Sequence, residues 1–186
     1  MPGKKTGISH LTERLAENLL REPFEFLSAD HYRHRLFCDA LDALAAQFTD
    51  PVDRPIAVLI TSYLEEDFEQ HLDDRADSLF PLLYRMPYLE DEVAAVLRVL
   101  SAEIETDRLL SLGLKECLQE FALTGQIGNR GRFEKLVAAY TEAQRRHMTL
   151  ETRIILPAAK RLLTDSEIQR FGREMAARRS IEYPNL

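Results

Sequence analysis

Hydrophobic residues recur along most of this chain at steps of three and four positions, the spacing of one face of an α-helix. Glycine and proline, with 7 and 8 copies, cluster between these stretches, and no stretch shows the sustained alternation of a β-strand. Short connections between long helices favour an antiparallel up-down-up-down four-helix bundle. The pattern therefore predicts an all-α fold with long helices over about residues 23–48, 52–83, 90–123 and 132–163.

Two short amphipathic segments flank the predicted bundle. Ser9 is a suitable N-cap for a first short helix that ends before Pro23. Thr164 and Glu167 have the spacing of a capping box and predict a last helix over about residues 165–179. We therefore expect three parts along the chain: an N-terminal extension with a short helix (residues 1–22), the bundle (23–163), and a C-terminal short helix and tail (164–186).

Arginines gather at the end of the last predicted helix, at positions 170, 173, 178 and 179. Such a cluster can bind an acidic partner, but basic residues at this place more often complement the dipole of a helix end. We expect the second role.

Composition and charge exclude several classes of protein. The 186 residues are 45% hydrophobic and 30% charged, with 24 Lys+Arg, 31 Asp+Glu and a formal net charge of -7, which argues against a nucleic-acid-binding protein. Uninterrupted apolar runs such as residues 56–60 are too short to cross a bilayer, and the first ten residues lack the apolar segment of a signal peptide. Cys38 and Cys117 are too few for a disulfide framework, so we expect a cytoplasmic protein that binds neither nucleic acid nor membrane.

Polar residues interrupt the hydrophobic stripes, the faces of the predicted helices that should point into the core. They are His31 and His34 in the first long helix, His71 in the second, and His147 with Glu151 in the fourth. His147 and Glu151 are four positions apart and therefore point the same way. Inward imidazoles and carboxylates from several helices are how bundles build metal sites, and this mixture suits iron or manganese. A single buried histidine is more often a hydrogen-bonded core residue, which is our interpretation of His34 taken alone.

Four stretches of sequence together resemble bacterial hemerythrin-like proteins with the HHE cation-binding domain. They are SADHYRHRLFCDALDALA around His31, HLDDRADSLFPLL from His71, LSAEIETDRLL around Ile104, and RRHMTLETRIILP from His147. The resemblance covers about residues 22–180. It implies a four-helix bundle with a non-haem di-iron centre and a link to oxygen, iron or oxidative-stress handling. It also implies metal ligands, at His31, His71, His147 and Glu151.

Two positions depart from the family pattern. The resemblance implies a bridging glutamate where this chain has Arg75, and a histidine where it has Ile104. The helical period leaves Asp74 and Arg75 as alternatives for one stripe position. A guanidinium group does not deprotonate in proteins, so Arg75 would place a permanent positive charge beside the metal. The altered set predicts a degenerate site that holds one metal or none, with His34 as a candidate substitute ligand.

Three interpretations of this degenerate site remain open. In the first, a cation-binding or sensing protein holds one metal while Arg75 turns away toward Asp74 or Asp77. In the second, a metal-free structural bundle pairs Arg75 with Glu151, with Asp107 or Asp74 as further partners. That bundle would act through a protein partner or as a homodimer. The third, a di-iron redox enzyme, is the least favoured because it would need more carboxylates in the core than the stripes show.

Overall fold

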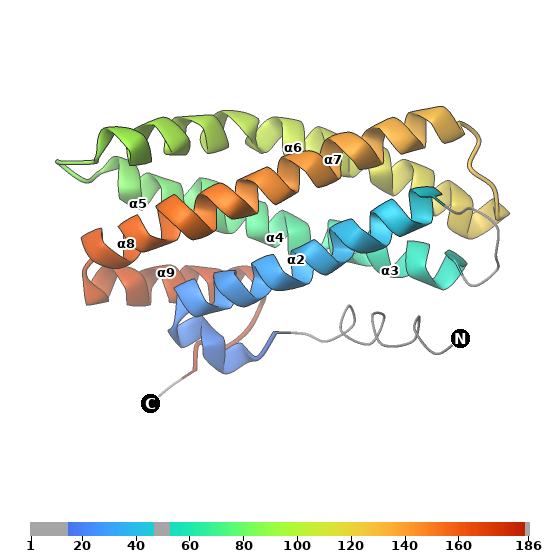
Figure 1. Ribbon diagram of the computed structural model, residues 1–186. Helices are drawn as coiled ribbons and strands as arrows, with labels where there is room; N and C mark the ends of the chain where they lie inside the picture. The colour runs from blue at the N-terminus through green and yellow to red at the C-terminus, as the bar shows by residue number, and fades with distance from the viewer. Residues whose placement is uncertain (1–14, 47–52, 185–186) are drawn as a thin grey trace, which may run out of the picture. The chain divides into compact units, whose positions relative to one another are not determined.

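The computed structural model describes residues 15–46 and 53–184, and every regular element in these ranges is helical (Figure 1). This confirms the predicted all-α class. η1 is a 3-10 helix, whereas η2 and η3 are π-helices. The elements in chain order are η1 (Glu17–Arg21), α2 (Pro23–Ala46), α3 (Asp53–Glu65), α4 (Asp67–Asp73), η2 (Asp74–Leu79), α5 (Phe80–Tyr84), α6 (Asp91–Thr124), α7 (Arg130–Leu150), η3 (Glu151–Ile155), α8 (Leu156–Leu162) and α9 (Asp165–Arg178).

The predicted long helices fall where the structure has helices. The helix expected over residues 90–123 is α6, and the last short helix is α9, which begins with the predicted capping box of Thr164 and Glu167. The second and fourth predicted helices each run through several consecutive elements, because a π-helix interrupts each of them and a turn at Glu66 separates α3 from α4. Residues 47–52, where the first predicted helix ends and the second begins, lie outside the described residues.

The N-terminal helix prediction is only partly covered by the structure. Ser9 and the first part of that helix lie outside the described residues. The described part forms the 3-10 helix η1 instead of an α-helix. η1 ends at Arg21, and Glu22 follows it with non-helical backbone angles, because the residue that precedes a proline is disfavoured in α geometry.

The packing divides the chain into two compact units. Among the described residues, unit 1 contains residues 32–46, 53–69 and 105–146, whereas unit 2 contains residues 15–31, 70–104 and 147–184. The division cuts through helices, so that α2, α4, α6 and α7 each contribute residues to both units.

Unit 2 holds an extensive apolar core that includes α9. Phe171 and Met175 of α9 are fully buried in this cluster, as is Leu20 of η1. A Cβ atom on Gly172 would lie 2.3 Å from the carbonyl oxygen of Leu20, so only glycine permits this approach of α9 to η1. Burial of each large apolar side chain stabilises the fold by about 1.5–3 kcal/mol, so α9 is an integral part of unit 2.

The two π-helices have similar surroundings. η2 begins at Asp74, next to Arg75, and ends just before Phe80 and Pro81. η3 begins at Glu151 and ends just before Leu156 and Pro157. The N–H of Phe80 donates to the carbonyl of Arg75, and the N–H of Leu156 donates to the carbonyl of Glu151. The prolines that follow do not end the helical path, because α5 continues to Tyr84 and α8 to Leu162. Single π-turns within helices are frequent at functional sites.

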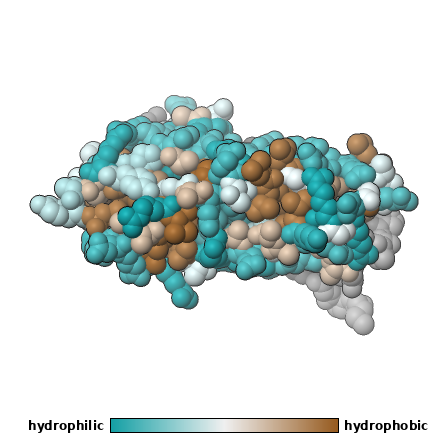
Figure 2. All heavy atoms as spheres, turned by 90° about the horizontal axis from the view of Figure 1, so that it is seen from above, coloured by the Kyte–Doolittle hydropathy of each residue, from teal (hydrophilic) through white to brown (hydrophobic). Residues whose placement is uncertain are grey.

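The surface mixes polar and apolar side chains. On the face seen in Figure 2, hydrophobic areas alternate with hydrophilic ones. Exposed apolar residues such as Leu123 and Tyr88 are normal on protein surfaces and do not by themselves mark an interface. None of the described helices combines the length and the apolar character that crossing a membrane would require.

Candidate metal centre

Three of the four predicted metal ligands come together inside unit 2. They are His31 on α2, His71 on α4 and Glu151 at the start of η3, and all are at most 1% exposed. One ligand atom from each residue lies within 4.8 Å of the other two. In the described part of the chain, this is the one group of three or more His, Cys, Asp or Glu side chains with such spacing. The helical stripes therefore identified residues that do converge.

Both histidine rings are held by a second polar group. Nδ1 of His71 lies 3.0 Å from Oδ2 of Asp30, and Nδ1 of His31 lies 3.1 Å from Oγ1 of Thr152. Nε2 of His31 lies 3.2 Å from Oε2 of Glu151. Histidines that bind metals commonly use one ring nitrogen for the metal and the other for such an outer partner, which fixes the ring orientation. In this arrangement Nε2 is the natural ligand atom of each ring.

Arg75 points into the same group. Its Nε lies 3.1 Å from Oε1 of Glu151, and both side chains are fully buried. Its guanidinium carbon also lies 5.5 Å from the ring centre of Phe80. The Arg75–Glu151 pair that the sequence offered as an alternative is therefore present, and a guanidinium group occupies one side of the carboxylate.

The ionisation of Glu151 is set by competing effects. Burial raises the pKa of a carboxyl group, but the charge of Arg75, the hydrogen bond with His31 and the charges of His31 and His71 outweigh it. Together they hold the pKa of Glu151 well below its ordinary value. Glu151 is therefore a carboxylate at neutral pH, the form that binds cations.

Asp74, the residue before Arg75, is fully buried and faces α9. Its Oδ1 accepts a hydrogen bond from Nη1 of Arg178 at 2.7 Å, and its Oδ2 accepts one from Nη2 of Arg179 at the same distance. Arg179 also donates to the carbonyl of Met175, which is the expected role at a helix end. The sequence predicted that these arginines interact with the end of their own helix, but it did not predict their contacts with Asp74. A hydrophobic stripe does not show which residue of another helix a buried carboxylate will contact.

The fourth predicted ligand, His147, lies outside the three-residue group. Its Nε2 is 2.6 Å from Oε2 of Glu103 on α6. Ile104, where the family resemblance implies a histidine, packs against the apolar core of unit 2. The interpretation in which Arg75 turns toward Asp74 or Asp77 is not what the structure shows, because Arg75 contacts Glu151 and Asp77 is exposed.

The other candidate residues belong to unit 1 and have their own partners. His34 Nε2 lies 2.9 Å from the hydroxyl of Tyr140, and its ring packs edge-on to Phe68 at 5.2 Å. Oδ1 of Asp107 accepts a hydrogen bond from Nε2 of Gln144 at 2.8 Å. His34 is thus a hydrogen-bonded core histidine, as interpreted from its sequence context, and Asp107 pairs with Gln144.

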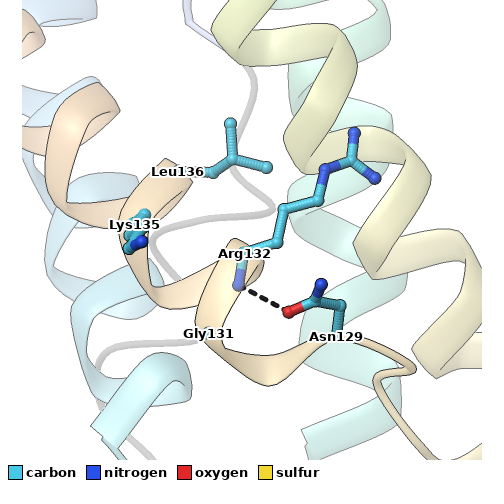
Figure 3. Close-up of a pocket in the computed structure, with 5 residues that line it drawn as sticks. All are labelled: Asn129, Gly131, Arg132, Lys135 and Leu136. Atoms are coloured by element: carbon cyan, nitrogen blue, oxygen red, sulfur yellow. Dashed lines mark hydrogen bonds between the residues drawn. The ribbon is translucent and has the colours of Figure 1, made fainter.

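A surface pocket in unit 1 is lined by other residues altogether. It lies at the start of α7, where the side chain of Asn129 accepts a hydrogen bond from the N–H of Arg132 (Figure 3). This contact caps the first turn of the helix. Lys135 and Leu136 complete the wall, and no predicted metal ligand takes part in it.

The donor chemistry of the buried group fits one transition-metal ion. Two imidazoles and one carboxylate form the ligand type of mononuclear non-haem iron sites. Arg75 adds a permanent cation on the carboxylate, at the position where the family resemblance implies a bridging glutamate. The residues present therefore suit a single ion better than a pair of irons, which requires carboxylates that bridge both.

Comparison with known proteins bears on this geometry. The model of the hemerythrin HHE cation-binding domain matches residues 22–159, which include all three converging residues and Arg75. The comparisons with curated proteins and with solved structures gave no match. The matched range is most of the chain and agrees with the all-helical fold, so the chain belongs to the hemerythrin HHE cation-binding family.

Proposed function

We propose that this chain is a hemerythrin-like cation-binding protein whose degenerate site takes a single metal ion on His31, His71 and Glu151. The observation that carries the proposal is the convergence of one ligand atom from each residue within 4.8 Å in a buried place. The family points to iron. Bound iron would supply a redox-active centre, which supports a role in sensing oxygen, iron or oxidative stress.

Arg75 sets the strength of this site. A metal ion that binds Glu151 must share the carboxylate with the guanidinium or displace it from Oε1. Two like unit charges at 4 Å repel by about 4 kcal/mol at the effective dielectric constant of a protein, and a divalent ion is repelled more strongly. We therefore expect weaker metal binding than a site with a second carboxylate would give.

One observation favours a second candidate function. The fully buried Arg75–Glu151 pair already places a cation against the carboxylate. The chain would then be a metal-free interaction bundle that acts through a partner protein or as a homodimer. Cys38 and Cys117 are both buried free thiols, which supports a location in a reducing cytoplasm under either candidate function.

The metal content of the purified protein tests the proposal. The untagged protein would be produced with added iron, purified without chelator and analysed by elemental mass spectrometry. We expect up to one equivalent of iron, lost in His71→Ala and retained in His34→Ala, the same change at another buried histidine. Less than about a tenth of an equivalent of any transition metal would overturn the proposal in favour of the metal-free bundle.

A further inference from the structure

The C-terminal end of α9 grips the start of η2 through buried polar contacts. Both oxygens of Asp74 accept hydrogen bonds, one from Arg178 and one from Arg179. Nη2 of Arg178 also donates to Oγ of Ser78 at 2.5 Å, and the guanidinium of Arg179 lies 4.7 Å from the ring centre of Phe26. A buried carboxylate must be paired, so these contacts determine where Asp74 lies. We call Asp74, Ser78, Arg178 and Arg179 the α9 clamp.

The helix that carries Arg178 of the clamp, α9, packs closely against its neighbours. α9 packs against η1 and η2, its first turn carries a capping box, and Gly172 permits its close approach to Leu20. α9 also lies beyond residues 22–159, the part of the chain that the family model matches. The clamp therefore joins an additional element of this chain to the site region of the family domain.

The clamp fixes one face of η2, and Arg75 lies on the adjoining face. Asp74 and Ser78 are four positions apart and both contact Arg178. Arg75 directly follows Asp74, and consecutive helical residues point in different directions around the axis. α9 thus contacts Asp74 and Ser78 on one face of η2, while the side chain of Arg75 contacts Glu151.

We propose that the α9 clamp is a rotational lock on η2 that keeps Arg75 on Glu151 and thereby lowers the affinity of the site for a metal ion. The inference rests on the proposed metal-binding function. Asp74, Arg178 and Arg179 act as positioning residues, since none of them belongs to the ligand group. Release of the clamp lets η2 rotate, moves Arg75 away from Glu151 and leaves the carboxylate to the metal.

Titration with Co²⁺, followed by its visible absorption bands, tests the lock. We expect the dissociation constant of Arg178→Gln/Arg179→Gln to fall by about 10-fold to 100-fold, the range in which outer residues alter metal affinity. Arg161→Gln is the matched control, because Arg161 and Glu90 form an ion pair in which both side chains are exposed, and it should bind Co²⁺ as the unchanged chain does. Equal affinity of the double variant and this control would overturn the inference.

Substitution of Asp74, the carboxylate of the clamp, distinguishes a lock from a simple charge effect. If the arginines acted only through their charge, Asp74→Asn would weaken Co²⁺ binding, because it removes a nearby negative charge. A lock predicts the opposite sign: Asp74→Asn should tighten binding as Arg178→Gln/Arg179→Gln does, and the triple variant should gain nothing further. Weaker binding by Asp74→Asn would overturn the lock.

Arg75→Gln distinguishes failure of the lock from failure of the proposed function. This variant should bind Co²⁺ more tightly, and the clamp substitutions should add nothing to it, because the clamp acts through Arg75. If Arg75→Gln fails to bind Co²⁺, the proposed metal site is wrong. If it binds while the clamp variants do not differ from the unchanged chain, only the lock is wrong. Should circular dichroism show that the double variant is unfolded, Arg178→Gln and Arg179→Gln are measured singly, and each must shift the affinity in the same direction.

Discussion

Arg75 and Glu151 form an ion pair with Nε 3.1 Å from Oε1, and neither side chain is exposed. Because both charges are buried, each side chain relies on the other to compensate its charge in the core. Loss of one partner leaves an uncompensated charge in the core, whereas loss of both removes the desolvation cost as well.

A double-mutant cycle measures this dependence. Arg75→Met and Glu151→Met should each lower the free energy of unfolding by about 3–5 kcal/mol, because each leaves its partner buried and uncompensated. The double variant should be far more stable than the sum of the two losses predicts. Urea unfolding in the presence of a chelator gives the values, and additive losses would contradict a coupled pair.

A metal ion should replace the lost cation in Arg75→Gln. This variant retains His31, His71 and the Glu151 carboxylate, so we expect Co²⁺ to bind the folded chain more tightly than the unfolded one. At 100 times the dissociation constant, linkage predicts a gain of about 2.7 kcal/mol in unfolding free energy. Thermal or urea unfolding with and without Co²⁺ checks this, and Arg75→Gln/His71→Ala should show no comparable gain.

The lowered pKa of Glu151 predicts loss of stability in acid. Above its ordinary pKa of 4.5 the carboxyl group is ionised in both the folded and the unfolded chain, so it adds no pH dependence. Below that value the unfolded chain takes up a proton and the folded chain does not. The free energy of unfolding therefore decreases as the pH falls toward the folded pKa, by at most about 1.4 kcal/mol per pH unit.

Glu151→Gln should remove this part of the acid dependence. Glu134→Gln, in an exposed ion pair on α7, is the comparison variant. Urea unfolding curves between neutral pH and acid give the slopes. Identical slopes for the unchanged chain and Glu151→Gln would show that the pair does not hold the carboxylate ionised.

Restoration of the two altered family positions should raise the metal capacity. Arg75→Glu removes the fixed cation and supplies a carboxylate, and Ile104→His supplies an imidazole at a partly buried position of α6. We expect the double variant to take up more than one equivalent of iron, measured by elemental mass spectrometry. A content that stays at or below one equivalent would mean that these positions do not correspond to the ligands of the family.

Cys38 should be unreactive in the folded chain. Burial raises the pKa of its thiol to about 12, so the reactive thiolate is scarce at pH 8. In the Cys117→Ser background, we expect labelling by a disulfide reagent to be slow in buffer and complete after unfolding in urea. Rapid labelling of the folded protein would contradict this environment of Cys38.

Hydrophobic spacing predicted the helices and three converging side chains, because a stripe records which face of a helix is buried. It could not assign His147, since the stripe does not specify that Glu103 on α6 will lie 2.6 Å from its imidazole. Pairing across helices depends on the tertiary packing, which a single helix pattern does not contain.

The helical period also failed at the start of η2. At 3.6 residues per turn, Asp74 and Arg75 are alternatives for one buried position, yet both are fully buried. The π-turn changes the angular spacing at this point, and α9 covers the side that a four-helix pattern leaves open. The role of Arg178 and Arg179 was missed for the same reason, because the sequence places them about a hundred residues from Asp74.

Arg75 gives the site a cation that cannot dissociate. A group tethered to the backbone has an effective concentration of about millimolar or higher, set by the chain and not by the surroundings. Chelators or metal starvation therefore leave Glu151 with a positive partner. The Glu151 carboxylate is thus paired whether or not metal is supplied, and we expect the chain to fold without metal.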